Sequence, residues 1–367
     1  FDLAIIGAGP GGYVTALRAA HHGLRVALIE EHEPGGVCLH TGCIPTKTMA
    51  AGVGLLRRAQ AARLAGLTLD LSENHLGQIN LRRDNVVQSL AQGVQQLLSK
   101  SDVQLIHARG RLTSADEIEL TPHEGEPTVM PRPRALVLAT GSRPIDIPTA
   151  PRDGRFILNS DDILRMEEKP AHFLILGGGY IGCEFASIFA QLGSQVTLVE
   201  MENRLLPGMD PDLAKLLQRQ FKQQGIALRL GRRMEAAQTN DGVTLTLDNG
   251  ETLTGDQLLV AVGRVPNTEN LGLETAGVEL EGRAIRVDNQ MQTTAPGIFA
   301  IGDVTGQMQL AHVATAQGRV VVDNLLDENA DAKMDYDQVP AAVFTHPEIA
   351  TIGLTPEQAE ERGVPVK

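Results

Sequence analysis

The chain has 367 residues, a formal net charge of −13 at pH 7, 42 % apolar residues and 21 % charged residues. These values are typical of a folded globular protein of two or three domains, and the acidic balance argues against a nucleic-acid partner. No segment reaches transmembrane length or resembles a signal peptide, and three cysteines fit a reducing, cytoplasmic compartment better than a disulfide scaffold.

The first predicted element is a buried parallel strand at residues 1–6. Because this strand opens at the first residue, we expect a few residues before it. The glycine-rich sequence at 7–12 follows with the spacing G-x-G-x-x-G, then a helix and a second strand at 25–30. That strand ends in Glu30, 23 residues after Gly7, where a ribose hydroxyl needs a carboxylate. The combination predicts a dinucleotide site, with a pyrophosphate at the helix N-terminus.

Cys38 and Cys43 come directly after this unit, with Ile44–Pro45 reading as the start of a helix. Their spacing allows the sulfurs to meet, and a thiol at a helix N-terminus is biased toward thiolate. We therefore expect redox chemistry. The alternatives are two packed thiols or a structural zinc site, but zinc needs four ligands and His40 is the only nearby addition.

The nucleotide-binding pattern recurs 170 residues later. A strand at 173–176 leads into the glycine-rich sequence 177–182, a helix, and a strand at 195–200 that ends in an acid. Each copy closes on a strand ending in G-x-x-P, at Gly141 and Gly263. The first copy carries about 48 more residues, and they coincide with the cysteines and with two helical patterns, roughly 44–65 and 80–100.

Segments 102–134 and 226–256 alternate and contain turn signals, which predicts a small antiparallel sheet in each. A strand at 297–303 ends in Asp303 and precedes a helix from about Leu310. Asp303 could bind a cofactor hydroxyl or act as an N-cap. From Tyr336 the pattern is strand-like, and it becomes helical again at about residue 355.

Residues 35–47 resemble the redox-disulfide signature of the flavoprotein disulfide reductases, the class I pyridine nucleotide-disulfide oxidoreductases. The two fingerprints, the two G-x-x-P closures, Gly302–Asp303 and the sequence 344–348 all follow that family's order, and the likeness is nearest to its lipoamide-type branch. The resemblance implies an α/β protein with two Rossmann-like domains, each with a parallel sheet and a small antiparallel sheet, and the start of an α+β interface domain. The implied division is an FAD-binding domain at 1–149 that carries the cysteine insertion, an NAD-binding domain at 150–270, the FAD-binding return segment at 271–335, and a truncated dimerisation domain from 336 to 367.

The resemblance also implies site residues. For FAD they are Gly7, Gly9, Gly12, Glu30, Lys47, Ala108, Gly141, Asp303 and Ala311. For NAD they are Gly177, Gly179, Tyr180, Gly182, Glu184, Glu200, Met234 and Gly263. Glu200 favours NAD over NADP, because a carboxylate at that strand end repels a 2′-phosphate. Tyr180 either gates the flavin face or simply packs, and Cys183 is expected to be a small buried apolar residue.

The catalytic residues implied are Cys43 against the flavin ring, Cys38 exchanging with the substrate dithiol, and Lys47 near the flavin and paired with Glu184. The family's catalytic base is a His, supported by a Glu, in the C-terminal interface domain that forms the homodimer. The sequence ends before such a His, and His346 does not match it. We therefore expect a fragment, or a protein without the thiol–disulfide half of the reaction.

The expected reaction is dithiol oxidation by NAD⁺ through FAD, with a free or protein-bound lipoyl group as substrate and a 2-oxoacid dehydrogenase complex as a possible partner. No metal site is expected. One alternative is reduction of mercuric ion or another disulfide by the same machinery. The other is a non-catalytic flavoprotein module of a multienzyme complex, against which the intact Cys38, Cys43, Lys47 and Glu184 count.

Overall fold

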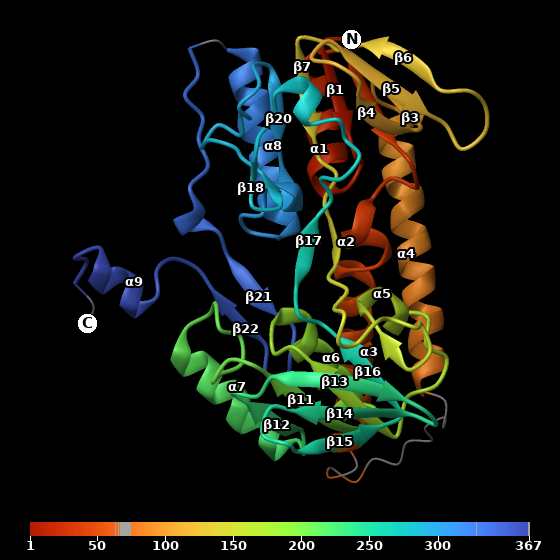
Figure 1. Ribbon diagram of the computed structural model, residues 1–367, viewed down its shortest axis with the longest axis vertical. Helices are drawn as coiled ribbons and strands as arrows, with labels where there is room; N and C mark the ends of the chain where they lie inside the picture. The colour runs from red at the N-terminus through yellow and green to blue at the C-terminus, as the bar shows by residue number, and fades with distance from the viewer. Residues whose placement is uncertain (63, 65, 67–74, 328, 366–367) are drawn as a thin grey trace. The chain divides into compact units, whose positions relative to one another are not determined.

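A computed structural model of the protein describes residues 1–62, 64, 66, 75–327 and 329–365. The chain forms two compact units, each assembled from separate stretches (Figure 1). The first unit comprises residues 1–40, 87–143 and 264–335, and the second comprises 41–86, 144–263 and 336–367. The expected α/β class with parallel and small antiparallel sheets is confirmed.

The first unit is built on a five-stranded parallel sheet in the order β20-β7-β1-β2-β3. Its strands are β1 (Leu3–Ile6), β2 (Val26–Glu30), β3 (Val103–His107), β7 (Ala135–Leu138) and β20 (Ile298–Ala300). The side chains of β1 and β7 are buried on both faces, as an uninterrupted apolar run predicts. Helices α1 (Pro10–His21) and α8 (Ala311–Leu326) pack so closely that a Cβ on Gly318 would lie 1.8 Å from Thr15 Oγ1.

Smaller elements complete the first unit. They are the antiparallel sheet β4 (Arg109–Leu112), β5 (Glu117–Thr121) and β6 (Thr128–Pro131), the hairpin β18 (Leu280–Glu281) and β19 (Ala284–Ile285), the short helix α2 (Gly36–His40), and the 3-10 turns η2 (Glu274–Ala276) and η3 (Gly302–Thr305). The antiparallel sheet expected over 102–134 is therefore shorter than predicted. Its first stretch, β3, pairs in parallel with β2 instead, because the edge of β2 offers hydrogen-bond partners to its backbone from a strand far away in the sequence.

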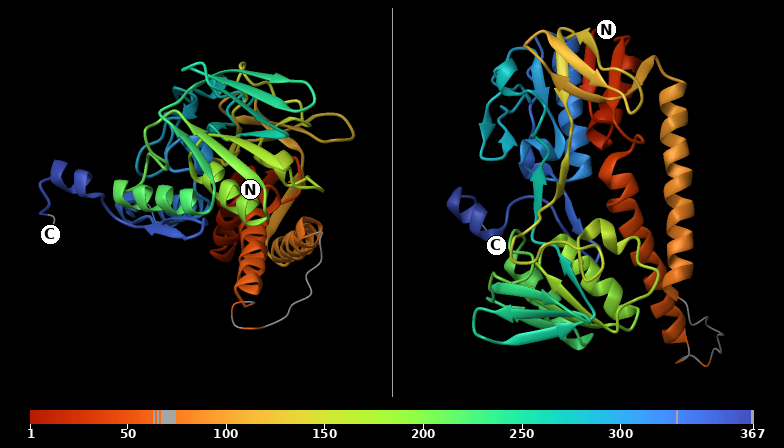
Figure 2. Two further views of the ribbon diagram at one scale, coloured as in Figure 1. Left: turned by 90° about the horizontal axis from the view of Figure 1, so that it is seen from below. Right: turned by 45° about the vertical axis from the view of Figure 1, so that its right-hand side comes forward.

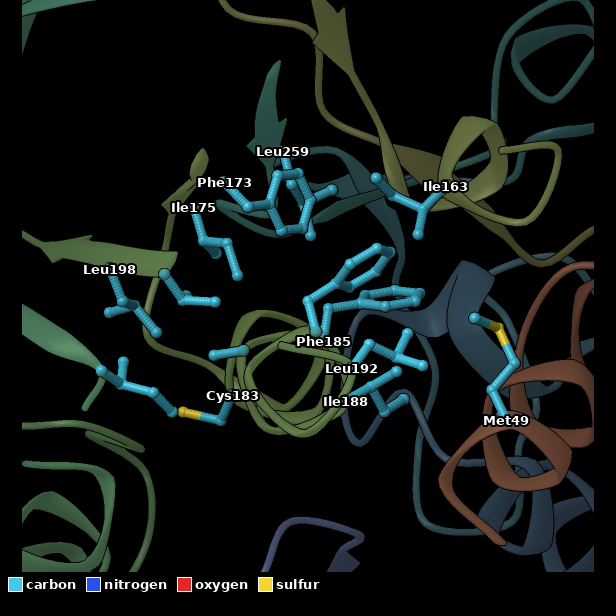
Figure 3. Packing of buried hydrophobic residues seen from close by; sticks show 14 of the residues in the cluster. Met49, Ile163, Phe173, Ile175, Cys183, Phe185, Ile188, Leu192, Leu198 and Leu259 are labelled. Carbon is cyan, nitrogen blue, oxygen red and sulfur yellow. The ribbon is translucent and has the colours of Figure 1, made fainter. Parts of the chain in front are cut away.

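The second unit repeats the parallel design in the order β12-β11-β10-β16-β9. Its strands are β9 (Ile157–Leu158), β10 (His172–Leu176), β11 (Gln195–Glu200), β12 (Ala227–Leu230) and β16 (Gln257–Val260), and its helices include α5 (Ser160–Ile163), α6 (Tyr180–Gln191) and α7 (Pro211–Gln223). Helix α6 is buried in the main apolar cluster, where its Phe185 packs with Phe173 and Met49 (Figure 3). That cluster fixes the place of α6.

The second unit also holds the antiparallel sheet β13 (Met234–Thr239), β14 (Val243–Leu247) and β15 (Thr252–Gly255), the hairpin β21 (Ala341–Val343) and β22 (Ile349–Thr351), the turn η4 (Tyr336–Gln338) and α9 (Pro356–Glu361). The antiparallel sheet expected over 226–256 is thus also shorter than predicted. Its first stretch, β12, extends the parallel sheet beside β11. Both errors concern an apolar segment whose partner strand is distant in sequence.

The two helical patterns near the cysteines become α3 (Cys43–Ala62) and α4 (His75–Ser99), and Figure 2 shows α4 as one uninterrupted helix. Residues 63 and 65, the end of the first predicted helix, lie outside the described residues. The boundary between the units falls inside α4, between residues 86 and 87. The strands β8 (Ser142–Pro144) and β17 (Arg264–Pro266) pair where the chain passes between units. No helix of the described residues is long and apolar enough to cross a membrane.

Candidate active site

The loop after β1 uses its three glycines differently. Gly7 has a φ of +101°, and a Cβ on it would lie 2.4 Å from the Ala139 carbonyl oxygen. A Cβ on Gly12 would lie 1.8 Å from the Gly7 carbonyl oxygen. Packing therefore requires these two glycines. Gly9 is the N-cap of α1, and a Cβ there would meet one described atom within 4 Å, the Gly36 Cα at 3.9 Å.

The loop after β10 repeats this arrangement. Gly177 has a φ of +109°, and its Cβ would lie 2.3 Å from the Ala261 carbonyl oxygen. A Cβ on Gly182 would lie 1.9 Å from the Gly177 carbonyl oxygen, whereas one on Gly179 would meet no described atom within 4 Å. The open side of the middle glycine lies at a helix N-terminus in both loops, which suits a pyrophosphate.

The acids that end β2 and β11 are held in the same way. Glu30 Oε2 accepts a 2.6 Å hydrogen bond from the Ala8 N–H, and Glu200 Oε2 accepts a 2.5 Å bond from the Gly178 N–H. The other oxygen, Oε1, also accepts a bond from the backbone two residues further along. The His32 N–H donates to Glu30 at 2.9 Å, and the Glu202 N–H donates to Glu200 at 2.8 Å. Each carboxylate is thus fixed at a glycine-rich loop, and its oxygens still have lone pairs for ribose hydroxyls.

The predicted redox cysteines lie in two helices that follow each other in the sequence. Cys38 is in α2, Cys43 is the first residue of α3, and both are half-buried. The unit boundary falls between His40 and Thr41, so each cysteine belongs to a different unit. Pairing of the two as the redox disulfide stays a prediction.

Cys38 is positioned by contacts within the first unit. A Cβ on Gly36, the first residue of α2, would lie 2.6 Å from the Gly9 Cα, so α2 sits directly against the first glycine-rich loop. Burial, and then the nearby Cys38 sulfur, raise the pKa of Tyr13. Among the described residues, no three His, Cys, Asp or Glu side chains gather as a metal site requires, so the geometry gives the zinc alternative no support.

Lys47, one helical turn after Cys43, forms an ion pair with Glu184 of α6. The Lys47 Nζ lies 2.9 Å and 2.8 Å from the two oxygens of Glu184, a residue that is only 6 % exposed. Glu184 also accepts a 3.0 Å bond from the Phe344 N–H, and the Lys47 Nζ lies 4.8 Å from the centre of the Phe344 ring. The sequence predicted the ion pair but missed Phe344, although it belongs to a block of the family resemblance.

Asp303 lies in η3, beyond the end of β20, so it does not terminate a strand as predicted. It is not an N-cap either, because Ile301 occupies that position in η3. Its Oδ2 accepts a 2.5 Å bond from the hydroxyl of Ser142, which is 3 % exposed. The Ser142 oxygen in turn accepts a 2.8 Å bond from the Arg264 Nε. The chain from Arg264 through Ser142 fixes the carboxylate, and sequence reasoning missed both residues.

The other predicted site residues fall into two groups. Ala108, Gly141 and Ala311 belong to the first unit, where the Ala108 N–H bonds to the Glu30 carbonyl at 3.0 Å. Tyr180, Met234 and Gly263 belong to the second. The Met234 side chain packs in an apolar cluster, so any contact with NAD would come from its backbone. Roles in cofactor binding remain predictions for all six.

Cys183 is fully buried in α6, which confirms the prediction that it is a small apolar residue. Its Sγ donates a 3.2 Å bond to the Gly178 carbonyl, and burial raises its pKa strongly. Tyr180 is 37 % exposed at the start of α6, and burial of part of its side chain raises the pKa of its phenol. The role of Tyr180, gating or packing, stays a prediction.

Comparison with known proteins settles the family. Residues 1–318 match the family described as pyridine nucleotide-disulphide oxidoreductase. The chain belongs to this family. Residues 339–367 match the dimerisation domain of the pyridine nucleotide-disulphide oxidoreductases. The expected resemblance is therefore confirmed, and the family's name matches the oxidoreductase chemistry and the pyridine nucleotide that the sequence predicted.

Several relatives of this pyridine nucleotide-disulphide oxidoreductase carry one name. Dihydrolipoyl dehydrogenase of Chlamydia muridarum is 40 % identical over all of this chain and 78 % of its own length. Dihydrolipoyl dehydrogenase of Bacillus subtilis is 38 % identical over 97 % of this chain and 78 % of its own length. The crystal structure of LpdA from Mycobacterium tuberculosis superposes with a TM-score of 0.92 at 32 % identity, covering 99 % of this chain and 80 % of that one.

A second structural neighbour has a different name. The HOCl-induced flavoprotein disulfide reductase RclA from Escherichia coli, in its Cu(II) complex, gives a TM-score of 0.87 at 31 % identity, and the match covers 99 % of this chain and 79 % of that one. The pyridine nucleotide-disulphide oxidoreductase fold is thus shared by proteins named for different reactions.

Proposed function

We propose that the protein is an FAD-dependent dihydrolipoyl dehydrogenase that oxidises a dihydrolipoyl dithiol and reduces NAD⁺. The observation that carries this proposal is the repeated glycine-rich loop together with the Cys38–Cys43 motif. All of this chain aligns with a dihydrolipoyl dehydrogenase at 40 % identity, over 78 % of that relative's length. The fixed Glu200 carboxylate supports NAD over NADP. Of the residues that we propose for FAD, Gly7, Gly9, Glu30 and Asp303 belong to the first unit.

The chain's own residues carry out dithiol exchange in this proposal. A substrate thiolate attacks the Cys38 sulfur of a Cys38–Cys43 disulfide and releases Cys43 as thiolate. The second substrate thiol loses its proton and attacks the mixed disulfide, which frees the oxidised substrate and leaves Cys38 as thiolate. Two electrons have then passed from the substrate to the cysteine pair. When bound, FAD supplies two-electron transfer between dithiol and nicotinamide. The ion pair with Glu184 fixes the Lys47 ammonium, which lies one helical turn after Cys43 in α3.

The experiment is an assay of the purified, full-length protein with dihydrolipoamide and NAD⁺, followed by the absorbance of NADH. We expect turnover with the wild type and none with Cys43→Ser, which should retain FAD. A Cys183→Ser variant is the matched control, because Cys183 is buried in α6, outside the redox motif. If Cys43→Ser oxidises the dithiol at the wild-type rate, the proposal is wrong.

The likeness to a flavoprotein disulfide reductase favours one second candidate, reduction of another disulfide. Reduction of mercuric ion, the alternative raised by the sequence, is tested beside it. The same protein assayed with NADPH and Hg²⁺, or with NADH and disulfides, separates the two. A higher kcat/KM for any of these substrates than for dihydrolipoamide would favour the second candidate.

The proposal extends to assembly and location. The match of residues 339–367 to a dimerisation domain supports a homodimer. The relatives named dihydrolipoyl dehydrogenase support a lipoyl group as substrate. We place the enzyme in the cytoplasm, bound to a 2-oxoacid dehydrogenase complex that presents the lipoyl group. Co-sedimentation with a lipoylated acyltransferase core tests that partner, and recovery of the enzyme only in the unbound fraction would argue against it.

A further inference from the structure

The segment after β21, residues 344–348, contacts Lys47 of α3 and Glu184 of α6. Phe344 is the first residue after β21, and it approaches the pair with two different groups. Its backbone N–H donates to Glu184 Oε1 at 3.0 Å, and its ring lies 4.8 Å from the Lys47 Nζ. All three residues belong to the second unit. One residue therefore contacts both the carboxylate and the ammonium.

Helix α6 holds this segment at two points. Glu184 accepts from the Phe344 N–H, and Ser187, one turn further along α6, accepts from the His346 N–H at 3.0 Å. Gln224 also donates to the His346 carbonyl at 2.6 Å. The N–H groups of Phe344 and His346, in the turn that joins β21 to β22, thus both donate to side chains of α6. These bonds fix the Phe344 backbone beside Glu184, within reach of Lys47 for its ring.

The Phe344 ring contacts the more exposed partner of the ion pair, the Lys47 ammonium. The Glu184 side chain is 8 % exposed, but the Lys47 side chain is 33 % exposed, so water competes for the ammonium. A cation within about 6 Å of an aromatic centre is attracted by the ring's quadrupole. The Phe344 ring therefore opposes rotation of the Lys47 ammonium out of the pair. Leucine would keep much of the apolar contact but not this attraction.

We propose that Phe344 is a positioning residue for Lys47: its ring holds the ammonium, and its backbone N–H holds the Glu184 carboxylate. The segment matched to the dimerisation domain thereby acts on the helix that begins at the redox cysteine Cys43. An effect of Phe344 on catalysis rests on the proposed function, whereas its effect on the position of Lys47 is independent of that function.

The test measures Lys47 itself in the full-length protein, with no dithiol present. Trace acetic anhydride labels amines, and mass spectrometry of the Lys47 peptide gives its acylation rate at several pH values. We expect Phe344→Leu to raise that rate by about two- to fivefold at fixed pH, because a cation–ring contact of this exposure is worth that factor. Phe344→Tyr keeps a ring and should restore the wild-type rate.

The matched control is Phe156→Leu, which removes the ring beneath Arg155 at 4.6 Å, also in the second unit. It should leave Lys47 labelling unchanged. Phe344→Met is the second variant, in case Leu lowers the melting temperature. If Phe344→Leu and Phe344→Met both label like the wild type, or if Phe344→Tyr labels like Leu, the proposal is overturned. Because labelling needs no dithiol turnover, this outcome is independent of the substrate assay.

Discussion

The sharpest prediction concerns Gly179 and Gly182, two glycines three residues apart with opposite expected effects. Gly179 has a φ of −76°, which alanine adopts freely, and a Cβ there would meet no described atom within 4 Å. Gly179→Ala should therefore change the free energy of unfolding by less than about 1 kcal/mol. The added methyl fills the space where we place the pyrophosphate. We expect the Kd for NADH to rise at least about tenfold, or about 1.4 kcal/mol.

Gly182→Ala should act on stability instead. Its Cβ would lie 1.9 Å from the Gly177 carbonyl oxygen, a backbone atom that cannot rotate away as a side chain would. Overpacking of this kind costs about 1–3 kcal/mol or more. In a chain of 367 residues, such a loss lowers the melting temperature by about 1–4 °C. Gly54→Ala in α3 is the control, because its Cβ would also meet no described atom, and it should stabilise by about 1 kcal/mol.

Thermal melts and calorimetric titration with NADH measure the two effects separately. Two results would refute the reasoning. Wild-type NADH affinity in Gly179→Ala would mean that the loop does not hold the nucleotide. A wild-type melting temperature in Gly182→Ala would mean that the close approach to Gly177 is not what requires glycine.

Three further predictions follow from single contacts. Glu200→Ala should reduce the ratio of NADH to NADPH affinity about tenfold, because a charge-assisted hydrogen bond and a repulsion disappear together, and an unchanged ratio in binding titrations would contradict this. Ser142→Ala should lower the free energy of unfolding by about 1–3 kcal/mol and weaken FAD retention on dialysis, because the Asp303 carboxylate loses the hydrogen bond from the Ser142 hydroxyl. Full FAD retention would show that this hydrogen bond does not contribute to FAD binding. Burial, and then Arg57, lower the pKa of His346 below its ordinary 6.5, so the unfolded chain takes up the proton first and the free energy of unfolding falls as pH drops below about 6.5. Denaturant titrations of His346→Gln should show a free energy of unfolding that depends less on pH than in the wild type. An unaltered slope would mean that another group causes the pH dependence.

The repeated nucleotide units were predictable because their determinants are local. A buried strand, a tight glycine turn and a helix start are adjacent in sequence, so the spacing from Gly7 to Glu30 and from Gly177 to Glu200 already requires one geometry. The structure shows the same near-contacts and hydrogen bonds in both copies. The errors were β3 and β12, which hydrogen-bond to parallel partner strands outside their own stretch of sequence.

The sequence by itself therefore determined the family, the two loops and the positions of Cys38 and Cys43, since each is written in a short, continuous stretch. Only the tertiary structure decided which side chains stabilise the site. Glu184 is 137 residues from Lys47 and Phe344 a further 160 beyond, and their meeting depends on how α3, α6 and the segment after β21 pack around a shared apolar cluster. Local spacing carries no information about such contacts, because packing brings distant segments together.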